Sequence, residues 1–435
     1  MIRKFIVYPV LFVMALSPAI SGSSIESDPL GETSDPMVQF ENANQPLSID
    51  DYLENPLLKL DVGRSYSSSD YSTIAKELSN RYPDIISYKT IGYSHDKKEI
   101  FSLVMTKNAP EMINRADFNV SRMHYYIEAG VHGRETVNPA ILMKQIEDYA
   151  TDYYKDSHIP GFNLEEILSK SVFHFVPLVN PDGHDLSKFG PDSVITPSAR
   201  EMLFSINDKD YSQWKANIAG VDLNKNFPDF HLNRQAGLLE DKWQNYPGSF
   251  FSSVPSGEFY PGSYAGSEPE TKAIMDYMAS YDFRSYVSYH SRGNLLYYEY
   301  IWFPDEYRKN ALEMAKKTNE ITGYKLIPDT GEGSGYSTSY YVSISLKPSL
   351  TIETLPYNTA LPSGNKTYME AYEKTWLLPL YYEALGRKTG YFPYRLYTDG
   401  QYVRDFPDKE YAEAIAESVG GEIIEGSGVP EFIIE

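Results

Sequence analysis

The stretch "MHYYIEAGVHGRETVNPAILMKQIEDYATDYY", from Met123 to Tyr154, joins two regular elements with different hydrophobic periods. Its first part, "MHYYIEAGV", is a nearly continuous apolar run and predicts a buried strand. Its last part, "PAILMKQIEDYATDYY", opens with Pro139 and has the apolar spacing of an amphipathic helix. A strand followed at once by a helix is typical of α/β folds. His132 and Glu135 lie in the loop between them, just past the carboxyl end of the strand, where open α/β sheets bind ligands.

The rest of the main body alternates in the same way between strand-like and helix-like segments. Apolar residues at helical spacing predict helices, and short runs rich in β-branched and aromatic residues predict strands. Helices are predicted at 71–86, 270–281 and 304–323, and strands at 87–94, 99–108, 171–183, 283–291 and 347–355. The alternation predicts an α/β domain with a mixed, largely parallel central sheet flanked by helices.

The end of the chain has a different pattern. Two strand-like runs flank an Asp-Gly hairpin signal at 399–400, a helical segment follows at 408–419, and a short strand-like run comes after two glycines. We therefore predict a main domain over 61–388 and a small ββαβ appendage over 389–435. A structural extension packed on the main domain and a module that binds a cell wall or another partner are both compatible with this pattern.

The first residues have the pattern of an export signal. Residues 1–22 combine two early basic residues, a short apolar run interrupted by proline, and small residues before the expected cleavage point. We predict a signal peptide over 1–22 and a leader or linker over 23–60, and hence a secreted or cell-envelope protein, bacterial in origin. The alternative is a membrane anchor. No later segment has the roughly 18 uninterrupted apolar residues of a membrane span, so none is expected after signal removal.

Composition narrows the classes of partner. The chain has a formal net charge of −21, which argues against binding nucleic acid because nothing offsets phosphate repulsion. The same charge argues against a polybasic surface that binds membranes. The chain has no cysteine, so a lipid cannot be attached through a cysteine after the signal.

A third candidate metal ligand lies far along the chain. His290 ends the predicted strand 283–291 and is followed by a polar turn. Together with His132 and Glu135 it completes two histidines and one carboxylate, a standard ligand set for catalytic zinc that leaves a position open for water. The remaining histidines fit this role less well. We expect packing or hydrogen bonding for His124 and His174, and exposure in polar loops for His95, His158, His184 and His231.

Glu353 is a candidate general base. It lies in the predicted strand 347–355 among leucine, threonine and isoleucine, where a carboxylate is costly unless it has a task or a partner. A zinc hydrolase needs such a group near the water that it activates. The alternative is a glutamate that faces outward from an edge strand.

Five motifs occur along the chain in the order found in the zinc metallocarboxypeptidases of the carboxypeptidase A type. They are "HGRE", "WKANIAGVDLNKNFP", "YPGSYAGSEPET", "YHSRGN" and "TIET". The chain resembles this family over roughly residues 65–385, and is most similar to its bacterial branch of γ-D-glutamyl-L-diamino acid peptidases, which cut the stem peptides of peptidoglycan.

The resemblance implies a role for each matching residue. It implies one zinc ion per chain, held by the two histidines and the glutamate named above, with Glu353 promoting attack by water. Asp222 matches the carboxylate that orients the first histidine. Lys215 matches the residue that polarises the scissile carbonyl, Asn224 and Lys225 match the pair that holds a terminal carboxylate, and Arg134 matches a further substrate contact.

Two of these positions depart from the digestive enzymes, which have arginine where this chain has Lys215 and Lys225. Lysine offers a compact charge in place of a two-pronged grip on a carboxylate. Tyr336 is the candidate for the tyrosine that closes over the substrate. Arg292, with Arg134 and the two lysines, is expected to read substrate carboxylates.

The sequence therefore predicts a secreted zinc peptidase that acts on peptidoglycan stem peptides. The alternatives are a secreted carboxypeptidase that acts on ordinary peptides and a non-catalytic binding protein of the same fold.

Overall fold

The structure is a computed structural model of the 435-residue chain. It describes residues 56–57, 65–115, 117–155, 159–206, 210–228, 230–233, 238–241, 251–300, 303–329, 335–357 and 365–430. The predicted signal peptide and nearly all of the leader lie outside these ranges, so both stay predictions. No helix within the described ranges has the length and apolar character needed to cross a bilayer.

The centre of the fold is an eight-stranded mixed sheet with the order β1-β2-β4-β3-β7-β10-β8-β9. Strands β4, β3, β7 and β10 run parallel to one another, whereas β1, β2 and β8 pair antiparallel with neighbours, and β9 is parallel to β8. The strands are β1 Ile86–Tyr93, β2 Glu99–Met105, β3 Met123–Ala129, β4 Ser171–Val176, β7 Phe283–Ser291, β8 Leu295–Tyr300, β9 Lys325–Asp329 and β10 Ser349–Thr354. The predicted fold class is confirmed.

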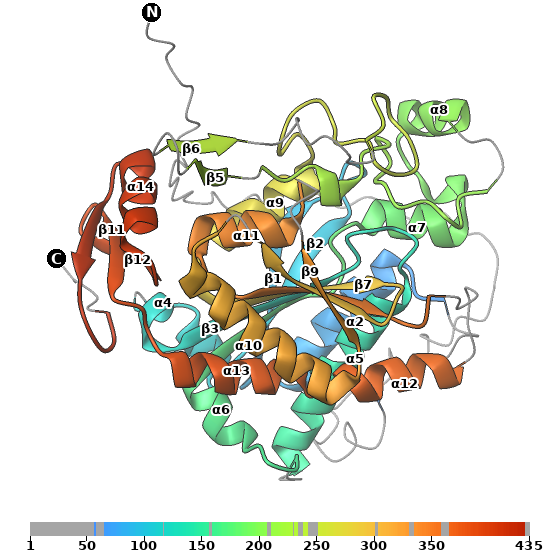
Figure 1. The fold of residues 1–435 in the computed structure, drawn as a ribbon. Coiled ribbons are helices and arrows are strands. Elements are labelled where there is room, and N and C mark those ends of the chain that lie inside the picture. The colour runs from blue at the N-terminus through green and yellow to red at the C-terminus, as the bar shows by residue number, and fades with distance from the viewer. Residues whose placement is uncertain are drawn as a thin grey trace, which may run out of the picture. The chain divides into compact units, whose positions relative to one another are not determined.

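Helices cover both faces of this sheet (Figure 1). The helices α2, α5, α6, α10, α12 and α13 lie on one side, and α9 and α11 lie on the other. The helices are α2 Ser68–Arg81, α3 Ala109–Met112, α4 Phe118–Ser121, α5 Val137–Lys155, α6 Leu164–Lys170, α7 Pro181–Phe189, α8 Pro197–Ile206, α9 Pro269–Ala279, α10 Asp305–Thr322, α11 Ser337–Ser345, α12 Asn365–Thr375 and α13 Leu378–Thr389, with short 3-10 helices at Pro191–Ser193 and Leu223–Lys225. A separate hairpin pairs β5 Phe230–Asn233 with β6 Leu238–Asp241.

Two predicted segments extended at least five residues beyond the observed ends. The helix expected over 71–86 ends at Arg81, because Pro83 disfavours a helical conformation in the residue before it, and β1 begins three residues after that proline. The strand expected over 171–183 ends at Val176. The helix α7 then begins at Pro181, and the side chain of Asn180 caps it by accepting from the Gly183 N–H at 2.8 Å.

The parallel strands β3, β7 and β10 lie side by side, so their carboxyl ends meet at one edge of the sheet. His132 follows β3, His290 lies near the end of β7, and Glu353 lies near the end of β10. Strand β10 is interior, between β7 and β8, so the alternative of Glu353 on an edge strand is wrong. The topology itself therefore gathers residues that are more than 200 positions apart in the sequence.

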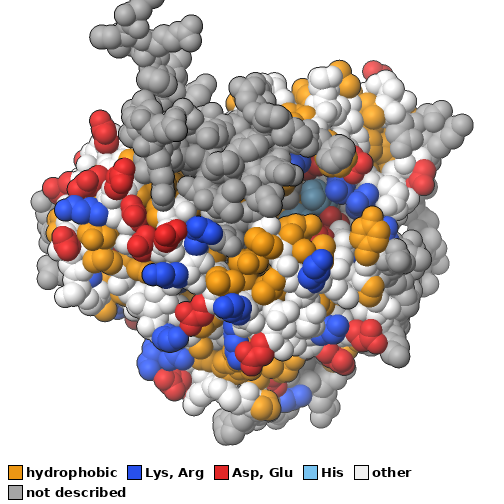
Figure 2. Space-filling view, viewed as in Figure 1, with side chains coloured by type: hydrophobic (Ala, Val, Ile, Leu, Met, Phe, Trp, Pro, Cys, Tyr) orange, Lys and Arg blue, Asp and Glu red, His pale blue; other side chains and the backbone are white. Residues whose placement is uncertain are grey.

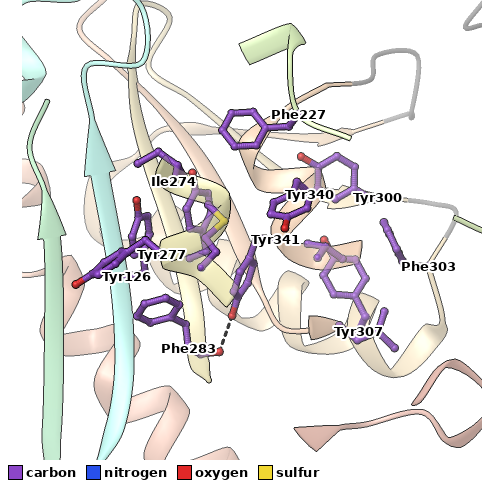
Figure 3. Packing of buried hydrophobic residues seen from close by; sticks show 14 of the residues in the cluster. Tyr126, Phe227, Ile274, Tyr277, Phe283, Tyr300, Phe303, Tyr307, Tyr340 and Tyr341 are labelled. Atoms are coloured by element: carbon purple, nitrogen blue, oxygen red, sulfur yellow. Dashed lines mark hydrogen bonds between the residues drawn. The ribbon is translucent and has the colours of Figure 1, made fainter. Parts of the chain in front are cut away.

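An aromatic cluster packs between the sheet and the helices α9 and α11 (Figure 3). The rings of Tyr126 on β3 and Tyr286 on β7 stack with centroids 5.0 Å apart. Tyr341 on α11 donates from its hydroxyl to the carbonyl oxygen of Phe283 at 2.7 Å. Burying one such side chain contributes about 1.5–3 kcal/mol, and a buried tyrosine hydroxyl needs a partner of this kind. The packing of this cluster thus holds β3 and β7, whose carboxyl ends carry the candidate metal ligands, in place.

The C-terminal residues form the predicted ββαβ unit. It comprises β11 Tyr394–Thr398, β12 Gln401–Phe406, α14 Lys409–Val419 and β13 Glu422–Glu425, with the antiparallel order β12-β11-β13. Asp399 and Gly400 both have positive φ, as a two-residue hairpin turn of this twist requires. Figure 2 shows acidic side chains on this part of the surface. The exposed glutamates of the unit are Glu410, Glu413, Glu417, Glu422 and Glu425.

This unit packs on the main body through apolar and charged contacts. Phe406 and Tyr411 belong to the aromatic cluster described above. Asp405, which is fully buried, lies 2.7 Å from Arg284 Nη1 and 2.8 Å from Lys347 Nζ. The unit therefore has the contacts of a structural extension. A binding role for it and the boundary at residue 388 stay predictions.

Candidate functional site

Three side chains converge at the carboxyl ends of β3 and β7. His132 Nδ1 lies 2.8 Å from Glu135 Oε1, His290 Nδ1 lies 3.1 Å from Glu135 Oε2, and the two Nδ1 atoms are 3.3 Å apart. All three residues are buried, and one ligand atom from each lies within 4.8 Å of the others. A single ion can therefore contact all three. The structure brings together the set proposed from the sequence.

A close approach between the loop after β3 and the first turn of α7 explains the glycine in the first motif. A Cβ on Gly133 would lie 2.3 Å from the carbonyl oxygen of Gly183, so no larger residue fits there. The Gly133 N–H donates to the carbonyl oxygen of Lys215 at 3.0 Å. This contact places the loop with His132 directly against the loop with Lys215.

Asp222 supports His132 from behind. Its Oδ1 lies 3.2 Å from His132 Nε2, and its two oxygens also accept from the backbone N–H groups of Asn224 at 3.1 Å and Phe259 at 3.0 Å. Burial acts to raise the pKa of Asp222, but the charge and hydrogen bond of His132 and the charges of nearby lysines outweigh it and lower that pKa. The Nε2–H bond to Asp222 leaves His132 Nδ1 free to bind a metal.

The electrostatics of the site favour a cation. Burial acts to lower the pKa of His132, but the charges of Glu135 and Asp222 raise it to about 9. The pKa of Glu135 is lowered, because the two histidines outweigh the effect of burial. The donor atoms and this excess of negative charge both fit Zn²⁺, which takes nitrogen and oxygen ligands from three residues in catalytic sites.

Glu353 lies beside this ligand set. Its Cα pairs with that of His290 across the parallel ladder between β10 and β7. Burial and the charge of Glu135 raise the pKa of Glu353, while His290, His132 and Lys215 oppose the rise. A raised pKa suits a carboxyl group that must both accept and release a proton near neutral pH.

The candidate substrate residues form a second assembly around the start of α11. Lys225 Nζ donates to the Tyr336 hydroxyl at 3.0 Å and lies 4.3 Å from the centroid of that ring. Asn224 Oδ1 accepts from the backbone N–H of Ser337 at 3.2 Å. The structure thus joins Asn224, Lys225 and Tyr336.

The other candidate cations lie around the ligand set. Lys215 Nζ is 3.7 Å from Glu258 Oε2 and influences both Glu353 and Asp222 electrostatically. Arg134 and Arg292 are partly exposed, and each is within two residues of a candidate ligand in the sequence.

The remaining histidines divide into three groups. His124 and His174 are buried and hydrogen-bonded to each other, with 2.8 Å between Nδ1 and Nε2, as predicted. The expectation for His184 was wrong, because it is buried beneath the start of α2, where its Nε2 lies 2.9 Å from the carbonyl oxygen of Tyr66. His158 has no described position, and the side chain of His231 is likewise outside the description.

His95 is also not simply exposed. Its Nε2 lies 2.8 Å from Glu268 Oε2, and its backbone N–H donates to Glu270 at 3.3 Å. These three residues form a second cluster of metal-ligand types that the sequence reasoning missed. Asn217 donates to both carboxylates, at 2.7 and 3.3 Å. Because protein donors already satisfy these oxygens, the cluster is explained as a structural network.

Comparisons with known proteins agree with this geometry. A family model described as zinc carboxypeptidase matches residues 71–390. A γ-D-glutamyl-L-diamino acid endopeptidase 1 from Lysinibacillus sphaericus is 26% identical over 252 residues, which cover 58% of this chain and 59% of that protein. Carboxypeptidase B2 from Bos taurus is 27% identical over 235 residues, which cover 54% of this chain and 45% of that protein. The chain thus spans less than two thirds of the length of either relative.

Solved structures share the fold. A crystal structure of thrombin-activatable fibrinolysis inhibitor has a TM-score of 0.58 at 18% identity, covering 78% of this chain and 82% of that chain. Carboxypeptidase A from Helicoverpa armigera has a TM-score of 0.52 at 19% identity, covering 77% and 78%. Since the family match spans most of the chain, the chain belongs to the zinc carboxypeptidase family, peptidase M14, and its candidate ligand set is assembled.

Proposed function

We propose that this chain is an exported metallopeptidase that hydrolyses an amide bond in peptidoglycan stem peptides, of the γ-D-glutamyl-diamino acid type. The observation that carries this proposal is that the cation in the assembly with Asn224 and Tyr336 is a lysine, Lys225, whose Nζ lies 3.0 Å from the Tyr336 hydroxyl. Lysine binds a carboxylate as a point charge, whereas arginine grips it with two parallel hydrogen bonds. The site is therefore suited to substrates whose carboxylates are not limited to one C-terminal α-carboxylate.

The residues divide the chemical work. His132, Glu135 and His290 would hold zinc, which polarises the carbonyl and activates water when bound. Glu353 accepts the proton of the attacking water and delivers it to the departing nitrogen. Lys215 stabilises the negative charge that develops on the carbonyl oxygen.

Stem peptides carry several free carboxylates, and the site carries several cations. Besides Lys215, which faces the carbonyl oxygen, Arg134, Lys225 and Arg292 can each bind one of these carboxylates. The similarity to a relative named for the γ-D-glutamyl-L-diamino acid bond supports the same substrate class. The export signal pattern at 1–22 supports a site of action outside the cytoplasm.

Removal of C-terminal residues from ordinary peptides is the second candidate function. It is favoured by the assembly of Asn224, Lys225 and Tyr336 into one site that can hold a terminal carboxylate. Relatives named carboxypeptidase, including the B2 enzyme of Bos taurus, also match the chain.

Digestion of defined substrates separates the two functions. The zinc-loaded protein is incubated with a stem peptide that contains a γ-linked D-glutamate, with its α-linked isomer, and with an ordinary peptide of equal length. Mass spectrometry identifies the bond that is cut, and the Glu353→Gln variant controls for contaminating peptidases. We expect cleavage after the γ-linked glutamate to be fastest. Stepwise shortening of the ordinary peptide with an intact stem peptide would instead support the second function.

A further inference from the structure

Glu128 is a fully buried carboxylate in the middle of the sheet, on β3. Its Oε2 accepts from the Tyr126 hydroxyl at 3.0 Å, and its Oε1 accepts from the hydroxyls of Tyr286, Ser288 at 3.0 Å and Ser337 at 3.1 Å. Keeping a carboxylate in such a place is costly unless it has a task, and supplying four hydroxyl donors requires several elements to cooperate. None of the family roles described above assigns a task to Glu128.

The register of the sheet places Glu128 on the same face as the candidate metal site. Glu128 and Ser288 are Cα partners on the parallel strands β3 and β7. His290 lies two residues beyond Ser288, and residues two apart on a strand project to the same face. Glu128, Ser288 and His290 therefore lie along one face of the sheet in a line that ends at the ligand set.

The distances make this line a continuous chain of hydrogen bonds. His290 Nδ1 faces Glu135, and His290 Nε2 lies 3.0 Å from Ser288 Oγ. When Nδ1 is the metal-binding nitrogen, Nε2 carries the hydrogen and donates to the serine oxygen. A hydroxyl can accept one hydrogen bond and donate another at the same time. Ser288 therefore donates a hydrogen bond to Glu128 Oε1, and the two hydrogen bonds strengthen each other.

We propose that Glu128 is the positioning residue of His290 and acts on it through Ser288. The arrangement is the counterpart of the direct contact between Asp222 and His132. It fixes the tautomer and the ring orientation of His290 and increases its basicity as a ligand.

The same carboxylate also holds the start of α11. Ser337 donates its hydroxyl to Glu128 Oε1, while its backbone N–H donates to Asn224. This branch does not lead to His290. It therefore supplies a matched control, since Ser288→Ala and Ser337→Ala each remove one serine hydroxyl from the same oxygen.

The test measures metal binding without substrate, so it is independent of the proposed substrate class. Zinc affinity is measured by competition with a chromogenic chelator, and the visible spectrum of the cobalt(II)-substituted protein reports the geometry of the ligand set. We expect Ser288→Ala and Glu128→Gln each to weaken zinc binding about 10–100-fold and to change the cobalt spectrum. Ser337→Ala should leave both unchanged. The Glu128→Gln, Ser288→Ala double variant should lose little more than the larger single effect, because both act through one chain.

Two results would overturn the proposal. The first is wild-type zinc affinity with an unchanged cobalt spectrum in Ser288→Ala. The second is an equal loss in Ser337→Ala, which would indicate general loosening around Glu128. Thermal unfolding checks that each variant is folded, and if Glu128→Gln does not fold, the two serine variants decide the question alone.

Discussion

Glu353 and His290 are Cα partners on the adjacent parallel strands β10 and β7, at the ends that face the site. The proposed general base and one of the candidate metal ligands are thus placed next to each other by a single backbone ladder. Their spacing does not depend on the conformation of a loop, which suits a site whose groups must stay within a fraction of an ångström of the productive geometry.

His290→Ala should strongly reduce zinc content, because it removes one of the three protein ligands. Elemental analysis of the purified protein measures the effect. The matched control is His95→Ala, which disrupts the other cluster of ligand types and should retain one zinc ion per chain. Full zinc content in His290→Ala would remove that residue from the ligand set.

Glu353→Gln should keep the zinc and the fold but lower the rate of hydrolysis by at least about 10²-fold, since glutamine cannot accept the proton of the attacking water. Steady-state kinetics and zinc analysis on the same preparation provide the measurement. Glu383→Gln is the control, because Glu383 is also a buried carboxylate but accepts from Ser171, at 2.7 Å. Near-normal turnover with bound zinc would assign the base to another group.

The two lysines should have separable effects. Lys215→Ala should chiefly lower kcat, because the charge that Lys215 stabilises develops only in the transition state. Lys225→Ala should chiefly raise KM, because Lys225 meets a carboxylate that is present throughout. Lys225→Arg should improve cleavage of ordinary peptides relative to stem peptides, since a two-pronged grip favours a terminal α-carboxylate. An unchanged preference in Lys225→Arg would argue against the role of this position in substrate choice.

Glu270 should make folding stability depend on pH. Burial raises the pKa of Glu270 from 4.5 to about 7, with His95 opposing the rise. Between these values the folded chain keeps a proton that the unfolded chain releases, so this group lowers stability as the pH rises. Glu270→Gln cannot ionise and removes that fall. Its melting temperature relative to wild type should therefore increase from about pH 5 to about pH 8, by at least about 2 °C.

Thermal unfolding at several pH values provides the test for Glu270. Glu413→Gln serves as the control, because it changes a glutamate that is exposed on α14. Parallel profiles for wild type and Glu270→Gln would contradict the assignment.

Asp405→Asn should destabilise the fold by about 3–5 kcal/mol, because it leaves the buried charges of Arg284 and Lys347 short of a partner. Denaturant unfolding measures the loss. Zinc content of the folded protein should not change, since these residues lie at the other ends of β7 and β10. A loss below about 1 kcal/mol, the scale of an exposed ion pair, would show that the network is not stabilising.

The sequence predicted the parallel centre of the sheet and the metal site for the same reason. Strong periodicity placed β3, β7 and β10, and the ligand types stood at their carboxyl ends, where chemistry is expected in α/β folds. His132 and His290 could be paired across 158 positions because both followed this rule and both lay in motifs of a known family. The pairing of β3, β7 and β10 side by side then brings these residues together in the fold.

What the sequence could not show were residues whose role depends on the register between strands. Glu128 is an acidic residue within an apolar run, and this pattern indicates a buried carboxylate with a function. Its hydrogen bond with Ser288, however, exists only because β3 and β7 align at those positions. His184 was misjudged because its polar neighbours suggested a loop, whereas Pro181 begins a helix that turns the imidazole inward.

The charges beneath the C-terminal unit have a consequence for protein engineering. Asp282 and Lys347 precede β7 and β10, and Asp405 reaches both Lys347 and Arg284 from β12. Deleting the unit would leave two cations and one anion in the core. The C-terminal unit therefore cannot be exchanged for another domain without disturbing the core. A replacement would have to deliver a carboxylate to the same buried point, and its success would depend more on that one group than on the match of its surface.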